Sequence, residues 1–454
     1  MSEVTFADLQ LAAPIQRVLE ENGYKKPSPI QAQAIPPILA GRDLIGCAQT
    51  GTGKTAAFAL PLLQLLNEPY KLEDYEIRAL VMVPTRELAV QVERSFETYG
   101  KYLKLRRALV FGGVSAGPQI KALRRGVDVC VATPGRLLDL FQQEHLDLDR
   151  TQYLVLDEVD QMLDMGFLPD VRRVCRELPG RRQSLFFSAT LSPAMKEIAD
   201  GIVHKPVTVR IDPEKPTVDR IDQRICYVPQ KMKIKLLEHI LNEQNENDKD
   251  FRTLVFSRTK HGADKICRSL AKAGLRADAI HGNKSQNARQ AALERFRDGR
   301  SPILVATDVA ARGLDIKGVS LIVNYDLPEV SESYIHRIGR TARAEASGMA
   351  IAFCAEEDGD LLRDILKLTR KPIESYKEHP FHSASIETRT ASQLTRQGGG
   401  GGGKPRQGGG YRGGRGGRGQ GGGGGRGGQG GSRGGGRGGN SRGGRGGRTS
   451  GRGR

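Results

Sequence analysis

The run Cys47-Ala48-Gln49-Thr50-Gly51-Thr52-Gly53-Lys54-Thr55 decides the fold, because it has the character of a turn between a buried strand and a helix. The segment before it, 43–46, is short and mostly apolar. The segment after it carries a helical apolar stripe at Ala56, Ala57, Phe58, Leu60, Leu62 and Leu63. Such a turn directs backbone N–H groups and the positive end of a helix at one point, so it predicts a phosphate-binding loop.

The residue types in this loop fit a polyphosphate with its metal ion. Gly51 and Gly53 let the backbone approach closely, Lys54 can reach the phosphate oxygens, and the Thr55 hydroxyl can bind a magnesium ion. The strict pattern has glycine where this chain has Ala48. The alternative is an ordinary glycine-rich turn with a solvated lysine.

The positive charge is concentrated at the C-terminal end. Residues 396–454 hold 14 Lys and Arg and no Asp or Glu, so of the net charge of +18 only +4 belongs to residues 1–395. From residue 397 the composition is almost entirely Gly and Arg, which cannot bury a core. We therefore expect a near-neutral folded part and a disordered, polycationic tail.

Cysteine spacing and hydropathy restrict the class of protein. None of the six cysteines lies within four residues of another, which excludes the usual zinc and redox spacings. Scattered single cysteines suit a reducing, cytoplasmic compartment. The sequence has no apolar run near 18 residues, so we expect no membrane span.

Short apolar runs alternate with helical patterns twice along the chain. Strands are predicted at 44–47, 79–83, 108–111, 127–132, 153–156 and 184–187, and again at 253–256, 277–280, 303–306, 321–324 and 349–353. This rhythm predicts two α/β halves, each with a parallel sheet covered by helices. The expected boundaries are 1–209, a linker at 210–219, 220–376, an extension at 377–396 and the tail at 397–454.

Two charged constellations follow predicted strands. Asp157 and Glu158 come directly after strand 153–156, where one carboxylate can hold magnesium through water and the other can orient the attacking water. In the second half, Arg340 and Arg343 lie one helical turn apart and can stabilise charge on a transferred phosphoryl group. The alternatives are a solvated acidic turn and a basic helix face.

Taken in order, these motifs resemble the DEAD-box ATP-dependent RNA helicases over about residues 6–376. The resemblance implies two tandem RecA-like domains that use ATP and Mg²⁺, with the metal held by Thr55 and Asp157. Among subgroups, a short core with a basic tail is most similar to the bacterial RhlE-like enzymes. Val159 stands where the family name has alanine, and Ala342 stands where glycine is usual.

The resemblance assigns nucleotide contacts beyond the phosphate loop, whose members are Ala48, Gln49, Thr50, Gly51, Thr52, Gly53, Lys54 and Thr55. Phe6, Tyr24 and Gln31 would recognise adenine. Asp315 would contact the ribose, and Gly313, in the same run, would belong to the ATP site. A coupling segment at Ser188 and Thr190 would link hydrolysis to strand separation through Asp160 and His336.

The resemblance also implies an RNA path that grips the backbone without reading bases. Its members are Pro84, Thr85, Arg86, Gly112, Gly113, Thr133, Pro134, Gly135, Arg136, Arg258, Gln286, Arg289, Thr307, Asp308 and Arg312. Contacts to 2′-hydroxyl groups would select RNA over DNA.

The expected function is ATP-dependent local unwinding of short RNA duplexes or remodelling of RNA–protein complexes. Ribosome-assembly or RNA-decay proteins are candidate partners, and no oligomer is implied. The alternatives are an ATP-gated RNA clamp or annealing protein and a DNA helicase. For the tail, the alternatives are an RNA-binding arm and an inert tether.

Deleting residues 398–454 tests the tail. We expect weaker RNA binding and a shallower dependence of affinity on salt. The reason is that fewer counterions are released on binding when fewer phosphates are contacted. The measurement is RNA affinity at several salt concentrations, with the rate of ATP hydrolysis at saturating RNA as the control. An unchanged salt slope would identify the tail as a tether.

Overall fold

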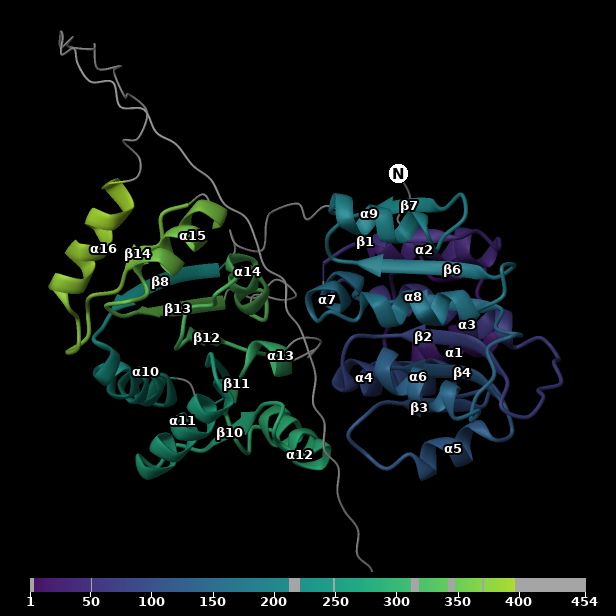
Figure 1. The fold of residues 1–454 in the computed structure, drawn as a ribbon, viewed down its shortest axis with the longest axis horizontal. Coiled ribbons are helices and arrows are strands. Elements are labelled where there is room, and N and C mark those ends of the chain that lie inside the picture. The colour runs from purple at the N-terminus through teal and green to yellow at the C-terminus, as the bar shows by residue number, and fades with distance from the viewer. Residues whose placement is uncertain are drawn as a thin grey trace, which may run out of the picture. The chain divides into compact units, whose positions relative to one another are not determined.

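The computed structural model describes residues 4–49, 51–211, 221–247, 250–311, 318–341, 348–369 and 371–396. These residues form two parallel sheets with helices on both faces (Figure 1). We call residues 4–211 the first lobe and residues 221–396 the second lobe. The predicted tail at 397–454 and nearly all of the predicted linker lie outside the described residues.

The elements of the first lobe are η1 (Ala7–Leu9), α1 (Ala13–Glu21), α2 (Pro29–Leu39), β1 (Leu44–Cys47), α3 (Lys54–Leu66), β2 (Ile77–Met82), α4 (Arg86–Tyr99), β3 (Arg107–Val110), α5 (Gly117–Leu123), β4 (Val127–Ala132), α6 (Pro134–Gln142), β5 (Tyr153–Leu156), α7 (Val159–Asp164), α8 (Leu168–Glu177), β6 (Gln183–Ser188), α9 (Pro193–Asp200) and β7 (Val207–Arg210). Those of the second lobe are β8 (Ile221–Tyr227), η3 (Gln230–Met232), α10 (Lys233–Asn247), β9 (Thr253–Phe256), α11 (Lys260–Lys272), β10 (Ala277–Ile280), α12 (Gln286–Arg297), β11 (Ile303–Ala306), α13 (Asp308–Ala311), β12 (Leu321–Asn324), α14 (Ser331–Ile338), β13 (Gly348–Cys354), α15 (Gly359–Thr369), β14 (Glu374–Ser375) and α16 (Ala384–Arg396).

The two sheets have the same topology. Their strand orders are β3-β4-β2-β5-β6-β1-β7 and β10-β11-β9-β12-β13-β8-β14, and all pairings are parallel. When the strands of each lobe are numbered from its own first strand, both orders become 3-4-2-5-6-1-7. The chain therefore repeats one α/β fold, as its sequence rhythm predicts.

Each sheet buries both faces, because alternate residues of its strands enter different cores. In β2, Val81 packs in one core with α2, α3 and α4, whereas Leu80 and Met82 pack in the other core with α6, α7 and α8. The second lobe follows the same rule, with Leu254 on one side of β9 and Val255 on the other. The carboxyl ends of the parallel strands consequently share one edge of each sheet, where loops carry the polar residues.

The central strands agree well with the sequence-based prediction, and the strands with the predicted bounds are β1, β4, β5, β9, β10, β11 and β12. The prediction missed β7, β8 and β14, which lie at one side of their sheets. The exposed or half-exposed side chains of Asp222, Gln223 and Arg224 hide the apolar signal of β8. None of the helices in the described residues combines the length and apolar character that crossing a bilayer requires.

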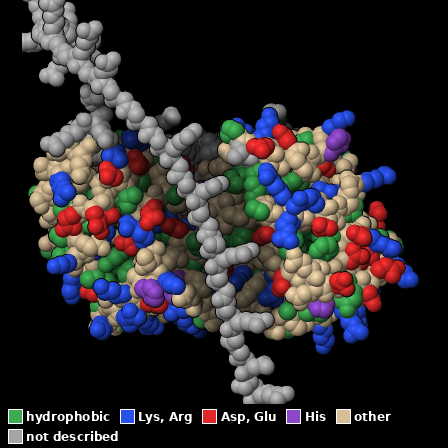
Figure 2. All heavy atoms as spheres, in the orientation of Figure 1, with side chains coloured by type: hydrophobic (Ala, Val, Ile, Leu, Met, Phe, Trp, Pro, Cys, Tyr) green, Lys and Arg blue, Asp and Glu red, His purple; other side chains and the backbone are tan. Residues whose placement is uncertain are grey.

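Charge on the two lobes is mixed in sign. Figure 2 shows basic and acidic side chains interspersed on the visible face of each lobe. This mixing fits the small net charge of +4 on residues 1–395. In the sequence, the long stretch that carries charge of one sign is the tail, with its Lys and Arg and no Asp or Glu.

One buried ion pair joins β2 to β4 inside the first lobe. Arg78 donates from Nη1 to Asp128 Oδ1 at 2.7 Å, and both residues are less than 10% exposed. Arg78 also donates to the carbonyl oxygen of Leu66 at 3.0 Å and lies over the ring of Tyr70. Removing the carboxylate would leave a buried guanidinium without its counter-charge, which is costly.

We predict that Asp128→Ala lowers the free energy of unfolding by roughly 3 to 5 kcal/mol, because it leaves Arg78 uncompensated. Urea denaturation measures the loss. Asp139→Ala is the matched control, since its ion pair with Arg136 is at the surface, with the Asp139 side chain 50% exposed, and is worth about 1 kcal/mol or less. Equal small losses in both variants would contradict the prediction.

Candidate functional site

The predicted phosphate loop joins β1 to α3 at the carboxyl edge of the first sheet. Gly51 and Gly53 have φ of 87° and 92°, in the left-handed region that favours glycine. A Cβ atom on Gly53 would lie 2.3 Å from Nε2 of Gln31, so the backbone conformation and this close contact both favour glycine. The loop therefore presents the N-terminus of α3 without side-chain obstruction. Thr50 lies outside the described residues.

The lysine of the loop is buried and bound to the loop itself. Lys54 is 5% exposed, and its Nζ donates to the carbonyl oxygen of Ala48 at 2.9 Å. Thr52 donates to the carbonyl oxygen of Gln49 at 2.7 Å, which narrows the turn. Thr55, the predicted metal ligand, is partly exposed beside Lys54 in the first turn of α3.

Gln31 connects the predicted adenine-reading segment to the phosphate loop. Its Oε1 accepts a hydrogen bond from the Ser28 N–H at 2.9 Å, and its Nε2 donates to the carbonyl oxygen of Gly53 at 3.2 Å. Each amide atom keeps capacity for one further hydrogen bond. The predicted aromatic residues differ, since Phe6 is buried in the core and Tyr24 is 47% exposed.

The acidic pair lies at the end of β5 in a constrained geometry. Asp157 is 2% exposed, and its Oδ1 accepts a hydrogen bond from the Glu158 N–H at 3.0 Å. Burial raises the pKa of Asp157 to about 7, while the nearby positive charge of Lys54 opposes the rise. Lys54 and Asp157 therefore share one site, although 102 residues separate them in the sequence.

Glu158 adopts an unusual backbone conformation. Its φ of 55° and ψ of 50° lie in the left-handed region, which costs a non-glycine residue roughly 1 to 2 kcal/mol. Its carboxylate accepts a hydrogen bond from Nε2 of the buried Gln161, one turn into α7. Gln161 was not among the site residues predicted from the sequence. Its place three residues after Glu158 was the available signal.

The predicted coupling segment contacts the acidic segment directly. Asp160 Oδ2 accepts hydrogen bonds from the N–H groups of Ala189 at 3.0 Å and Thr190 at 3.2 Å. The Thr190 N–H also lies 3.3 Å from the Ser188 hydroxyl oxygen. Since β6 lies between β5 and β1, this segment sits between the acidic pair and the phosphate loop. The neighbouring Val159 is fully buried in the core.

Three of the predicted RNA-facing runs converge at the ends of β2, β3 and β4. A Cβ atom on Gly113 would lie 2.0 Å from Arg86 Nη1, which places the Arg86 guanidinium against the Gly112-Gly113 turn. Gly113 has a φ of 81°. Arg136 reaches the same turn and lies 3.4 Å from the carbonyl oxygen of Val114. Thr85, Thr133, Pro134 and Gly135 flank these contacts at the starts of α4 and α6, and Pro84 precedes Thr85.

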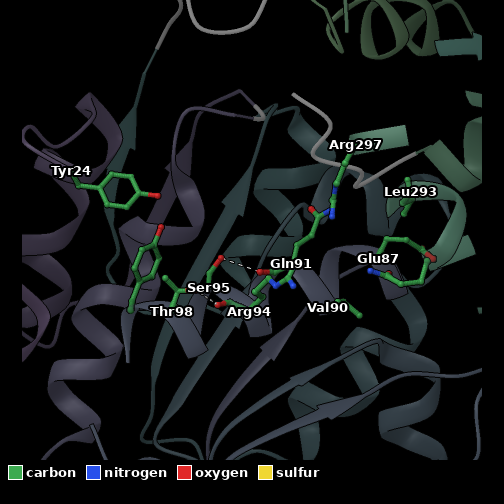
Figure 3. Close-up of a pocket in the computed structure, with 11 residues that line it drawn as sticks. Tyr24, Glu87, Val90, Gln91, Arg94, Ser95, Thr98, Leu293 and Arg297 are labelled. Carbon is green, nitrogen blue, oxygen red and sulfur yellow. Dashed lines mark hydrogen bonds between the residues drawn. The ribbon is translucent and has the colours of Figure 1, made fainter. Parts of the chain in front are cut away.

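Helix α4 continues from this region with a polar face. Figure 3 shows Gln91, Ser95 and Thr98 along it, near Tyr24, beside a hollow of about 260 Å³. No residue of the phosphate loop lines this hollow. It is therefore distinct from the predicted ATP site.

At the start of α4, Glu87 is buried and holds two of the predicted RNA-facing residues. Gln286 donates to Glu87 Oε1 at 3.0 Å, and Arg289 pairs with Glu87 Oε2 at 2.8 Å. Gln286 and Arg289, which were predicted to face RNA, therefore both bind the carboxylate of Glu87 in the structure. This contact was not predicted from the sequence.

The second lobe places His336 and Arg340 beside a buried arginine that the sequence analysis also missed. Arg337 is 2% exposed, and its guanidinium binds both carboxylate oxygens of Asp308, at 2.6 and 2.7 Å. It also donates to Asn324 Oδ1 at 2.9 Å. Asp308, predicted to face RNA, therefore holds α14 in place, and Thr307 directly precedes it at the end of β11.

Several predicted residues cannot be placed. Arg312, Gly313, Asp315 and Arg343 lie outside the described residues, as does Ala342. Arg340 is described and is 6% exposed. Of the nucleotide contacts predicted for this lobe, Arg340 is the one within the described residues. His336, which lies in α14, lines the same small pocket as Arg340.

Comparison with known proteins agrees with this arrangement. The family model of the DEAD/DEAH box helicases matches residues 28–198, and that of the helicase conserved C-terminal domain matches residues 232–345. A DEAD-box ATP-dependent RNA helicase, CshA, from Bacillus licheniformis is 40% identical over 374 residues, which are 82% of this chain and 75% of the relative. The ATP-dependent RNA helicase DBP2 of Candida albicans is 41% identical over 404 residues, 88% of this chain and 71% of the relative.

A solved structure extends the likeness to the fold. S. cerevisiae Dbp5 bound to RNA and ADP BeF₃ is 30% identical, with a TM-score of 0.73 over 86% of this chain and 99% of that one. Both lobes are therefore RecA-like.

The pKa of Asp157 gives a pH prediction for the protein without nucleotide or metal. Because burial raises this pKa to about 7 from about 3.9 in the unfolded chain, the folded state holds the extra proton between these values. Wild-type stability should therefore fall as pH rises from about 4 to 7. The Asp157→Asn variant has no carboxyl group to lose this proton. Its free energy of unfolding relative to that of wild type should therefore increase between pH 5 and pH 8 in urea denaturation with EDTA. A difference that is independent of pH would contradict the assignment.

Proposed function

The chain belongs to the DEAD/DEAH box helicase family, and from this membership we infer that it is an ATP-dependent RNA helicase whose ATP hydrolysis is stimulated by RNA. The observation that carries this inference is the meeting of Lys54 and the acidic pair at one sheet edge, with the coupling segment between them. Lys54 would bind the phosphates of ATP, and the acidic pair would serve hydrolysis. The coupling segment would link hydrolysis to strand separation.

The first lobe supplies the nucleotide site. The N-terminus of α3 and the backbone of the glycine-rich turn suit the phosphates. Lys54, now bound to Ala48, would exchange that contact for phosphate oxygens. Gln31 would bind adenine with the remaining hydrogen-bonding capacity of its amide. Its hydrogen bond to the carbonyl oxygen of Gly53 would connect the adenine contact to the phosphate loop.

The oxygen ligands beside Lys54 fit a magnesium ion. The Thr55 hydroxyl and the Asp157 carboxylate are hard donors of the kind that Mg²⁺ prefers. Burial is the main cause of the raised pKa of Asp157, and a divalent cation beside this group would favour its charged carboxylate. When bound, the ion would neutralise charge on the phosphates. Glu158 would orient the attacking water, held by its hydrogen bond to Gln161.

We further propose that Arg340 and Arg343 of the second lobe complete the site when the lobes close. Arginine from a neighbouring domain stabilises the charge of phosphoryl transfer. The buried Arg337 supports this role, because its bonds to Asp308 fix the orientation of α14, which ends just before Arg340. Closure on ATP and RNA would then bend the bound strand and open a short duplex locally.

RNA would lie along the carboxyl edges of both sheets. Glycine turns, hydroxyl groups and single arginines, such as Gly113, Thr85 and Arg136, suit a sugar-phosphate backbone and carry no base readout. The boundaries 1–209 and 220–376 remain our proposal for the two domains. They are supported by the extents of the two sheets, which end at Arg210 and run from Ile221 to Ser375.

A duplex-opening assay tests this function against its rivals. We expect the chain to separate a short RNA duplex when ATP is added, and to leave a DNA duplex of the same sequence paired. Lys54→Ala should abolish both hydrolysis and unwinding, because the phosphates lose their cationic contact. Hydrolysis without strand separation would favour an ATP-gated clamp, and equal opening of the DNA duplex would favour a DNA helicase.

A further inference from the structure

A cluster of charged side chains is buried beneath Arg258, at the strand ends of the second lobe. Lys233, the first residue of α10, has a side chain that is 1% exposed. Its Nζ donates to Asp358 Oδ2 at 3.0 Å and lies 3.8 Å from Asp326 Oδ1. Asp358 is itself 3% exposed in its side chain. A buried lysine and carboxylate are costly to desolvate, so the fold holds them in close contact.

Arg258 forms the outer part of this cluster. Its Nη2 lies 3.5 Å from Asp358 Oδ1, and its backbone N–H donates to Asp326 Oδ2 at 2.9 Å. The Ser257 hydroxyl donates to the same Asp326 oxygen at 3.2 Å. The Arg258 side chain remains 37% exposed. The guanidinium is thus attached to the buried cluster by one edge, while part of it faces solvent.

The cluster is balanced in charge, with two carboxylates and two cations. Asp358 divides its oxygens between the cations, because Oδ2 accepts from Lys233 and from the Ala355 N–H, whereas Oδ1 faces Arg258. Lys233 therefore takes up much of the negative charge of the two acids. Arg258 is held by one carboxylate oxygen and keeps donors for an external anion.

We propose that Asp358, supported by Lys233 and Asp326, is a positioning residue that holds the Arg258 guanidinium ready to bind a phosphate of RNA. The proposal rests on the proposed function, since it deepens the RNA contact of the second lobe. A flexible arginine loses rotamer entropy when it is fixed, and a partner that orients it beforehand reduces this cost on binding.

Whether RNA affinity rises or falls on removal of Asp358 distinguishes a positioning role from a general effect of net charge. Removing an acidic residue near a phosphate-binding surface should strengthen RNA binding if only net charge matters. Removing Asp358 should weaken it if Asp358 orients Arg258. Asp360 provides the matched control, because it lies two residues away in α15, pairs with Arg363 at 2.7 Å and is 76% exposed in its side chain.

The experiment measures the affinity of the full chain for a fluorescent single-stranded oligouridine RNA, in the presence of a non-hydrolysable ATP analogue. We expect Arg258→Ala to weaken binding roughly 5-fold, as for one exposed arginine–phosphate contact. Asp358→Asn should weaken it roughly 3-fold, and the double variant should bind no more weakly than Arg258→Ala alone. Asp360→Asn should bind as tightly as wild type or slightly more tightly.

Thermal unfolding of each variant shows whether the second lobe is folded. If Asp358→Asn fails to fold, the exchange of Lys233→Met together with Asp358→Asn removes both buried charges at nearly constant volume and replaces it in the cycle. Wild-type affinity in the Asp358 variant, or a loss that adds fully to that of Arg258→Ala, would overturn the positioning role while leaving the helicase assignment intact. A wild-type chain that binds no RNA would instead overturn the proposed function.

Discussion

The site depends on a carboxylate that is kept out of water beside a lysine. Asp157 and Lys54 are both nearly fully buried, and the charge of one acts on the pKa of the other. The lysine bonds to a neutral carbonyl group, and burial raises the pKa of the acid. In the proposed site, the phosphates of ATP would give Lys54 an anionic partner in place of this carbonyl oxygen.

The repeated fold explains how this site can be linked to RNA. Both lobes place polar loops at the carboxyl edges of parallel sheets with the same strand order. In the first lobe, the predicted phosphate loop and the acidic pair follow β1 and β5, and the turns predicted to face RNA follow β2, β3 and β4. Asp160 accepts hydrogen bonds from the N–H groups of Ala189 and Thr190, so these bonds connect the acidic segment directly to the neighbouring loop.

Local sequence patterns predicted the elements that are buried on both sides. The strands β1 and β9 have the predicted bounds, because continuous apolar runs are local signals. The strand β8 was missed because its polar residues mask the pattern. Arg337 was missed for a different reason. In the sequence it belongs to a basic run, and only the fold brings it to Asp308, 29 residues away. Lys233 and Asp358, 125 residues apart, show the same limit.

The rate of ATP hydrolysis with and without RNA tests the account most directly. If the two lobes each carry an incomplete part of the site, the full chain at saturating ATP and magnesium should hydrolyse slowly alone and severalfold faster with single-stranded RNA. The increase should saturate with RNA concentration. A rate that is equally fast without RNA would show that the first lobe already holds a complete site, and would contradict the account.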